Sequence, residues 1–401
     1  MSRHIREHKM KNLIAMTLML AVMSGCTETQ EVAKVKAKER WELSRAQVIY
    51  GVGMEHLKVG QLDQAYGKAQ ESLALAPDFQ PARILLAKVY IEQGNYSDAA
   101  TELKTVCDKA PRAAEPVYLL GVAQEKMQQY DQALASYRKA YALDNSRLEA
   151  VKAAAEVLIL TDRIEEARTL VASCISRAGT DPALYETAGR IAMIQKDYTQ
   201  AARFFLDAHD LDFQNLRYRE VLAEAQYLSG QYADAADTLK QLLAVKDYVG
   251  TAVTYSRMGD CNMAVGDYVE ARNAYYKATE LSPNNAGVWV NLAQAALALK
   301  DNDRAIASAR TALTVEAGNL DATLILAYGL LKNNKADQAI EILQKSATFH
   351  ADSAQLQLVL GRALQAAGQK DKAQAAFNKA LALEPENKLA KELAKTTDDM
   401  K

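Results

Sequence analysis

The sequence predicts an all-α protein in which about ten two-helix hairpins stack into an α-solenoid. Three observations support this prediction. A period of 34 residues organises residues 46–387, two places of that period hold only small residues, and no proline falls inside an expected helix. A repeat array buries its core between neighbouring repeats, so 401 residues can form one elongated array instead of several compact domains.

The period emerges when four prolines, Pro77, Pro111, Pro283 and Pro385, are aligned at one place. Residues 250–251 are then the only insertion. Residues 388–401 suit a capping helix and tail, because Leu389 and Leu393 lie one turn apart among charged residues. The ten repeats cover 46–79, 80–113, 114–147, 148–181, 182–215, 216–249, 252–285, 286–319, 320–353 and 354–387.

Two columns of the repeat are small throughout. The eighth place holds Gly53, Ala87, Gly121, Ala155, Gly189, Ala223, Gly259, Ala293, Ala327 and Gly361. The twentieth place holds Ala65, Ala99, Ala133, Ala167, Ala201, Ala235, Ala271, Ala305, Ala339 and Ala373. Antiparallel helices approach closely only where no large side chain separates their backbones. We therefore expect both columns at the contact between the two helices of each hairpin, where a larger residue would overpack at a cost of roughly 1–3 kcal/mol.

Turn residues fit the same frame. A glycine stands at the fifteenth place in five repeats, where the first helix ends and a left-handed residue is useful: Gly60, Gly94, Gly230, Gly266 and Gly368. The sixteenth place offers N-caps for the second helix in Asn95, Asp197, Asp267 and Asp301. Three further prolines, Pro81, Pro116 and Pro182, fall in first turns, where their missing N–H costs little.

This pattern resembles the tetratricopeptide repeat, whose aromatic places are partly kept as Tyr90, Tyr137, Tyr275, Trp289 and Phe377. The pentatricopeptide repeat, an RNA-binding relative, differs in period. A net charge of -2 also lacks the basic character of a nucleic-acid platform. The resemblance implies a right-handed superhelix whose first helices line a concave groove and whose second helices form the convex back.

The resemblance also implies which residues face a ligand, namely those at places two, five, nine, twelve and thirteen. In the middle of the chain these are Glu149, Lys152, Glu156, Glu186, Arg190, Arg217, Glu220, Glu224 and Tyr227. Toward the end they are Val290, Gln294, Leu297, Leu324, Tyr328, Leu331, Leu358 and Arg362. The surface would thus pass from charged to apolar. The apolar residues either bind a helix or extended peptide, or pack against the next repeat.

One known ligand type of the family is not expected. Its clamps for carboxylate-ended tails use lysine at the fifth place and asparagine at the ninth. Here the only lysine at a fifth place is Lys152, and its ninth place holds Glu156.

Residues 1–26 resemble a bacterial lipoprotein signal. Four basic residues between Arg3 and Lys11 precede an apolar run from Leu13 to Met23, which is too short to span a bilayer, and Ser24-Gly25-Cys26 follows. In such proteins the cysteine thiol is acylated and the preceding peptide is removed. Thr27 stands where aspartate favours the inner membrane, so the resemblance implies an outer-membrane anchor facing the periplasm.

Residues 27–45 would then be a polar tether, with a helix starting near Trp41 and running into the first repeat. Three alternatives stay open for this end of the chain. It is an ordinary secretory signal with a chance cysteine, translation starts at Met10, or the protein is a soluble cytoplasmic adaptor.

No catalytic motif is present: the sequence contains no dinucleotide-binding GxGxxG, no P-loop and no GxSxG elbow. Histidines are scattered and lack partners at ligand spacing, so we expect neither a metal nor a cofactor. Outside the signal the cysteines are Cys107, Cys174 and Cys261, which fit small buried positions in helices.

We therefore expect a non-enzymatic scaffold that binds a protein or peptide in its groove and a bilayer through acyl chains. Its expected role is assembly or docking for an envelope machine such as a pilus, a secretion system or a polysaccharide exporter. The alternative role is an accessory subunit that positions or regulates a cell-wall or glycan enzyme.

Overall fold

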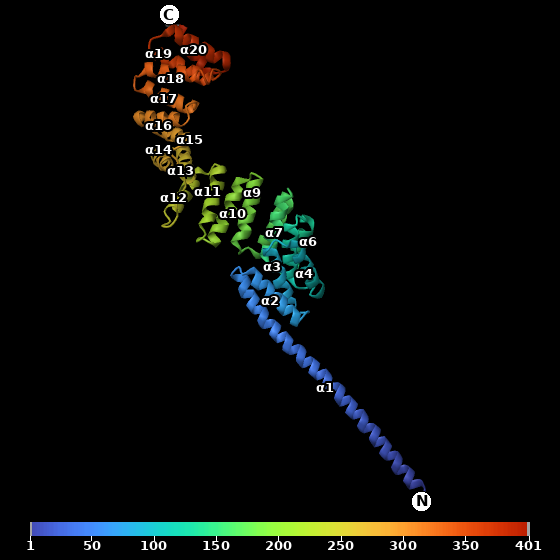
Figure 1. Cartoon of the computed structure of the whole chain (residues 1–401). Helices are drawn as coiled ribbons and strands as arrows, with labels where there is room; N and C mark the ends of the chain where they lie inside the picture. Colours follow the sequence, from blue (N-terminus) through green and yellow to red (C-terminus); the bar gives the residue numbers. More distant parts are fainter. Residues whose placement is uncertain (1, 399–401) are drawn as a thin grey trace. The chain divides into compact units, whose positions relative to one another are not determined.

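A computed structural model describes the backbone of residues 2–398 and the side chains of residues 30–177 and 179–395. The described backbone forms 21 α-helices and no strand, as the sequence predicts. The chain divides into two compact units, Met1–Gly179 with helices α1–α8 and Thr180–Lys401 with helices α9–α21 (Figure 1).

Each hairpin consists of a first and a second helix joined by a short turn. From the second repeat on, the first helix begins at the residue that opens the 34-residue frame. These first helices are α3 (Gln80–Glu92), α5 (Ala114–Lys126), α7 (Leu148–Leu160), α9 (Pro182–Ile194), α11 (Leu216–Leu228), α13 (Ala252–Val265), α15 (Ala286–Ala298), α17 (Leu320–Lys332) and α19 (Ala354–Ala366).

The second helices alternate with them along the chain, and α21 (Lys388–Asp398) follows the last one. They are α2 (Leu62–Leu75), α4 (Tyr96–Lys109), α6 (Tyr130–Leu143), α8 (Ile164–Ala178), α10 (Tyr198–Leu211), α12 (Tyr232–Leu243), α14 (Tyr268–Leu281), α16 (Asn302–Val315), α18 (Ala336–Ser346) and α20 (Lys370–Leu383).

Helix α1 (Ser2–Lys58) is longer than the sequence suggested, since it begins far before Trp41 and the expected tether is helical throughout. Only its C-terminal part belongs to the first hairpin, where Tyr50, Met54 and Leu57 pack on Ala65 and Ala69. The predicted acylation residue, Cys26, lies outside the described side chains. Within the described part of the chain, no helix has both the length and the hydropathy needed to cross a bilayer.

All twenty residues of the two small columns are buried. The structure also shows what the glycines face, which is the twenty-fourth place of the same repeat. A Cβ on Gly121, Gly189, Gly259 or Gly361 would lie 2.4–2.7 Å from a ring atom of Tyr137, Phe205, Tyr275 or Phe377, respectively. The five repeats with alanine at the eighth place carry smaller partners there, namely Leu103, Val171, Leu239, Ala309 and Leu343. Small and large residues therefore compensate each other within a hairpin.

The turn between the helices of a hairpin is left-handed in all ten repeats. The predicted glycines have φ between +74° and +84°. The same place in the other repeats holds residues that the sequence analysis did not predict, with φ of +58° to +61°: Gln128, Asp162, Lys196, Lys300 and Asn334. The turn is therefore set by the stacked fold and not by glycine alone.

The N-cap predictions are confirmed at three of four positions. The side chains of Asp197, Asp267 and Asp301 each accept a bond from the backbone N–H three residues later, at 3.0–3.1 Å. Asn95 occupies the N-cap of α4 without such a side-chain bond.

The cysteines within the repeats are unpaired. Cys174 and Cys261 are fully buried and Cys107 is half-buried. Burial raises the pKa of the Cys261 thiol to about 11, so this group is a packed, unreactive side chain at neutral pH.

Candidate functional site

The candidate site is the first-helix face, meaning the side chains at the predicted ligand-facing places of the first helices. Its charged part is only partly accessible. Lys152 and Glu156 on α7 are half-buried, as are Glu186 and Arg190 on α9 and Glu224 and Tyr227 on α11, whereas Arg217 and Glu220 on α11 are exposed.

Several of these groups connect one repeat to the next. The Arg217 Nε atom donates to Glu186 Oε1 at 3.0 Å, which joins α11 to α9. The Arg257 Nη2 atom lies 3.4 Å from Glu224 Oε1, which joins α13 to α11. The hydroxyl of Tyr248 donates to Glu220 at 2.9 Å. A large part of the predicted charged surface thus holds neighbouring hairpins together.

Asp260 continues this series and was not among the predicted residues. It accepts bonds from the Tyr275 hydroxyl at 2.7 Å and from Asn291 Nδ2 at 3.3 Å, so it joins α13 to α15. Burial raises the pKa of its carboxyl above the ordinary value, against the opposing effects of Tyr275 and Arg257. Arg257 and Asn291 stand at the sixth place, which is not a ligand-facing place of the family. Asp260 stands at a ninth place, which is the signal that could have found it.

The apolar part of the predicted groove is mostly packed. Val290, Leu324 and Leu358 are less than a tenth exposed and belong to one core cluster, and Leu297 and Leu331 pack against that cluster. For these residues the structure favours the second reading, contact with the neighbouring repeat. Gln294, Tyr328 and Arg362 are exposed.

The structure brings three predicted residues together at one cleft between α17 and α19. Tyr328, Leu331 and Arg362 line a space of about 190 Å³ with Lys332 and Val359. The Lys332 ammonium lies 5.3 Å from the centroid of the Tyr328 ring, a cation–π distance. Neither Lys332 nor Arg362 forms an ion pair with a described residue. Two available cations beside an aromatic ring suit a peptide that carries a carboxylate next to an apolar side chain.

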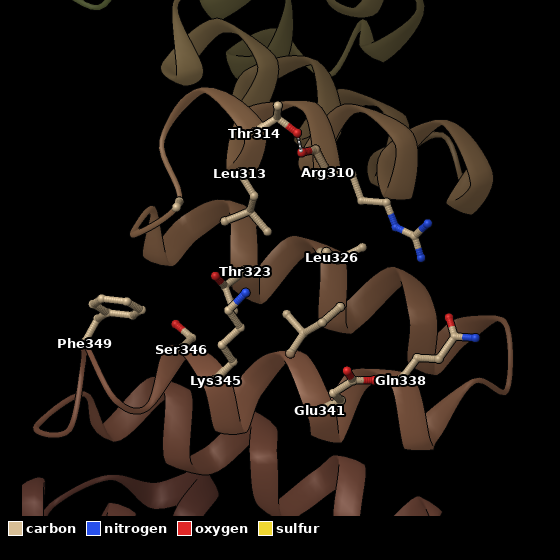
Figure 2. Close-up of a pocket in the computed structure, with 12 residues that line it drawn as sticks. Arg310, Leu313, Thr314, Thr323, Leu326, Gln338, Glu341, Lys345, Ser346 and Phe349 are labelled. Atoms are coloured by element: carbon tan, nitrogen blue, oxygen red, sulfur yellow. Dashed lines mark hydrogen bonds between the residues drawn. The ribbon is translucent and has the colours of Figure 1, made fainter.

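A larger cleft lies on the other side of the hairpins, between the second helices α16 and α18 (Figure 2). It holds about 700 Å³ and has apolar walls of Leu313, Leu326 and Ile342, with the Lys345 and Phe349 side chains also lining it. Helix α18 ends at the twenty-seventh place of its repeat, whereas α16 and α20 reach the thirtieth. Phe349 is consequently on a turn and 65% exposed.

The early end of α18 was not predicted, and similar clefts recur elsewhere. Spaces of about 460 Å³ and 590 Å³ lie between α6 and α8 and between α10 and α12. These clefts are a regular result of the spacing between second helices. The cleft at Tyr328 therefore remains the better candidate, because it unites predicted ligand-facing residues with free charge.

Among the described side chains, no group of three or more histidines, cysteines or carboxylates could hold a metal ion.

Comparison with known families decides the assignment. Models of the tetratricopeptide repeat match residues 56–121, 125–191 and 262–319, residues 354–387 and residues 216–241, which together exceed half of the chain. The chain belongs to the tetratricopeptide repeat family. The tetratricopeptide frame explains why the small columns and the left-handed turns recur every 34 residues, and proteins of this family generally mediate protein–protein interactions.

Curated relatives share only part of the array. The small glutamine-rich tetratricopeptide repeat-containing protein 2 of Mycosarcoma maydis is 32% identical over 124 residues, which are 31% of this chain and 35% of that protein. The CTR9 homolog of Arabidopsis thaliana is 25% identical over 178 residues, 43% of this chain and 16% of that protein. The chain thus spans about a third or less of the length of these relatives.

Solved structures resemble the chain in fold. The Cut9–Hcn1 hetero-tetramer structure of the APC/C matches with a TM-score of 0.40 and 13% identity, over 90% of this chain and 98% of that one. The MamA protein matches with a TM-score of 0.41 and 19% identity, over 44% of this chain and 95% of that one.

Proposed function

We propose that this tetratricopeptide repeat protein is a non-enzymatic scaffold that binds a protein partner at the Tyr328 cleft. The observation that carries the proposal is the pairing of an exposed aromatic ring with two cations that have no ion-pair partner among the described side chains. An exposed ring costs solvation without a contact, and free cations attract carboxylates. The partner segment we expect is an extended peptide with an acidic residue beside an apolar one.

The neighbouring structure supports such a site. The walls of the cleft come from two successive first helices, α17 and α19, which are fixed by the buried residues Leu324 and Leu358 beneath them. The site is therefore held in place before a ligand arrives, which reduces the ordering cost of binding.

We further propose that the protein is anchored through lipid on Cys26 and docks components of a bacterial envelope machine at the outer membrane. The support is the sequence alone: the basic segment, the short apolar run and the small residues before Cys26. Labelling of cells with palmitate tests this anchor. We expect label on the wild-type chain and none on Cys26→Ala, and equal labelling of both would remove the anchor from the proposal.

A pull-down with matched variants tests the binding site. The full chain is immobilised from detergent-solubilised envelopes as wild type, Tyr328→Ala, Arg362→Glu and Arg310→Glu. The last variant makes the same charge change on the second-helix side. We expect one enriched protein that is lost with Tyr328→Ala and Arg362→Glu and kept with Arg310→Glu. A partner that ignores both cleft variants would place binding elsewhere.

The alternative role, an accessory subunit of a cell-wall or glycan enzyme, would appear in the same experiment. In that case the protein lost with the cleft variants is a glycan-active enzyme, and its activity changes when this chain is added. A soluble cytoplasmic adaptor would show neither palmitate label nor an envelope partner.

A further inference from the structure

Helix α1 carries an exposed seam on the face away from the repeats. The α1 seam consists of Trp41, Arg45, Val48, Val52, Glu55 and Val59, with alternating spacings of four and three residues. This alternation is the spacing of residues along one edge of a coiled coil. All six residues are exposed, and the four apolar ones are 43–69% exposed.

The seam is not used by the first hairpin. Tyr50, Gly53 and Leu57 lie on the opposite side of the helix, where they are buried or half-buried against α2 and α3. Val59 follows the last residue of α1, but its N–H still bonds to the Glu55 carbonyl at 3.2 Å, so it continues the same face. The seam runs over about 27 Å at the helical rise of 1.5 Å per residue.

The seam is complementary to itself when a second copy runs in the opposite direction. Antiparallel pairing centred on residue 50 places Trp41 against Val59 of the second copy and Val48 against Val52 of the second copy. The same register places Arg45 against Glu55 of the second copy, and the two-fold axis repeats each pair. A parallel pair in register would instead set Arg45 against Arg45 and Glu55 against Glu55.

The two charged seam residues are available for this contact. Arg45 forms no ion pair with any residue of the described chain. Glu55 pairs with Lys58 in the same turn at 2.8 Å, where both side chains are more than 60% exposed. Such a surface pair contributes little and is easily exchanged.

Gly51 gives a second, independent indication. It lies within α1, is exposed, and a Cβ there would meet nothing within 4 Å, so the single chain gives no reason for a residue that weakens a helix. In the antiparallel register Gly51 faces Gly51 of the second copy beside the two-fold axis. The absence of a side chain allows the two helices to approach closely at that point.

We propose that two copies of this chain associate through antiparallel pairing of their α1 seams. The occupant of the seam is a second copy, because the charges and the small residue match only when the sequence meets its own reverse. This association is separate from partner binding at the Tyr328 cleft, and either proposal can fail without the other.

Sedimentation equilibrium of the full chain in detergent tests the charge pairing. We expect a dimer whose dissociation constant rises at least about tenfold in Arg45→Glu, since two favourable pairs become two repulsive ones. The double variant Arg45→Glu/Glu55→Arg is expected to return to within about threefold of wild type. Arg40→Glu is the matched control, an exposed residue of the same helix outside the seam, and should leave the constant unchanged.

Cysteine cross-linking tests the direction of the helices. On a Cys26→Ala background, a mixture of Trp41→Cys and Val59→Cys chains should form a disulfide-linked dimer, while each variant alone should form none. Circular dichroism confirms that each variant keeps its helices. The proposal is overturned by a monomer at all concentrations, by a dimer indifferent to Arg45→Glu, or by cross-linking of Trp41→Cys with itself.

Discussion

Gly189→Ala is expected to destabilise the α9–α10 hairpin, although alanine is the better helix former. A Cβ at this position would lie 2.5 Å from Cε1 and 2.7 Å from Cδ1 of Phe205. An optimal carbon–carbon contact is about 3.5–4.0 Å, so the ring must retreat by roughly 1 Å. Phe205 is 1% exposed and has no free space to enter. Overpacking costs roughly 1–3 kcal/mol and the gain in helix propensity is at most about 1 kcal/mol, which leaves a net loss of about 1–2 kcal/mol.

A second substitution at residue 205 tests the stated cause. The chain itself shows the compensated pair, since Ala223 in the next repeat stands with Leu239 at the twenty-fourth place. Phe205→Leu should therefore be less harmful in the Gly189→Ala background than in the wild type, with a coupling of about 1 kcal/mol. Gly67→Ala is the control, because Gly67 lies in α2 with nothing within 4 Å of its Cβ position, and it should stabilise by roughly 0.5–1 kcal/mol.

Urea unfolding followed by circular dichroism measures these changes, and hydrogen exchange of residues 182–211 shows whether the loss is local. The reasoning fails if Gly189→Ala stabilises as Gly67→Ala does. It also fails if the cost of Gly189→Ala is the same with phenylalanine and with leucine at residue 205.

Three further changes follow from the same structure. Lys300→Gly should raise the thermal midpoint by relieving a left-handed residue at φ +61°, a gain of about 1 kcal/mol, and Gly266→Ala at φ +84° should lower it; equal effects of both would contradict this. Asp260→Asn should stabilise more near pH 7 than near pH 4, because the raised folded pKa means that the folded chain holds this proton more tightly, so stability falls as pH rises above the ordinary value of 3.8; unfolding midpoints across pH measure it, and a larger gain at acid pH would refute it. Tyr137→Phe should cost about 0.5–1.5 kcal/mol by removing the 2.6 Å bond to Glu125, measured by urea unfolding with an exposed tyrosine, Tyr276→Phe, as the neutral control.

The fold was predictable because the constraint repeats. One glycine proves little, but a small residue at the eighth place of every repeat reports a contact that every hairpin must make. The partner of that contact was less visible. Phe205 and Tyr275 could be recognised as aromatic places, but only their distances to Gly189 and Gly259 show why glycine and not alanine stands there.

The candidate site was harder to predict because a ligand-facing place and a packing place share one helix. Leu324 and Tyr328 are four residues apart on α17, yet the first is buried and the second is exposed. The difference depends on how far each repeat rotates relative to the next, which no single repeat encodes. The ion pairs of Arg217 and Arg257 were missed for a related reason, since each joins residues about one period apart.

The main contacts of every helix are with helices one or two places away in the chain. Opening one hairpin therefore breaks its own two seams and leaves distant hairpins intact. Tension applied between a tethered amino terminus and a bound partner would then be absorbed hairpin by hairpin, so the array can lengthen in steps under load and still keep hold of both ends.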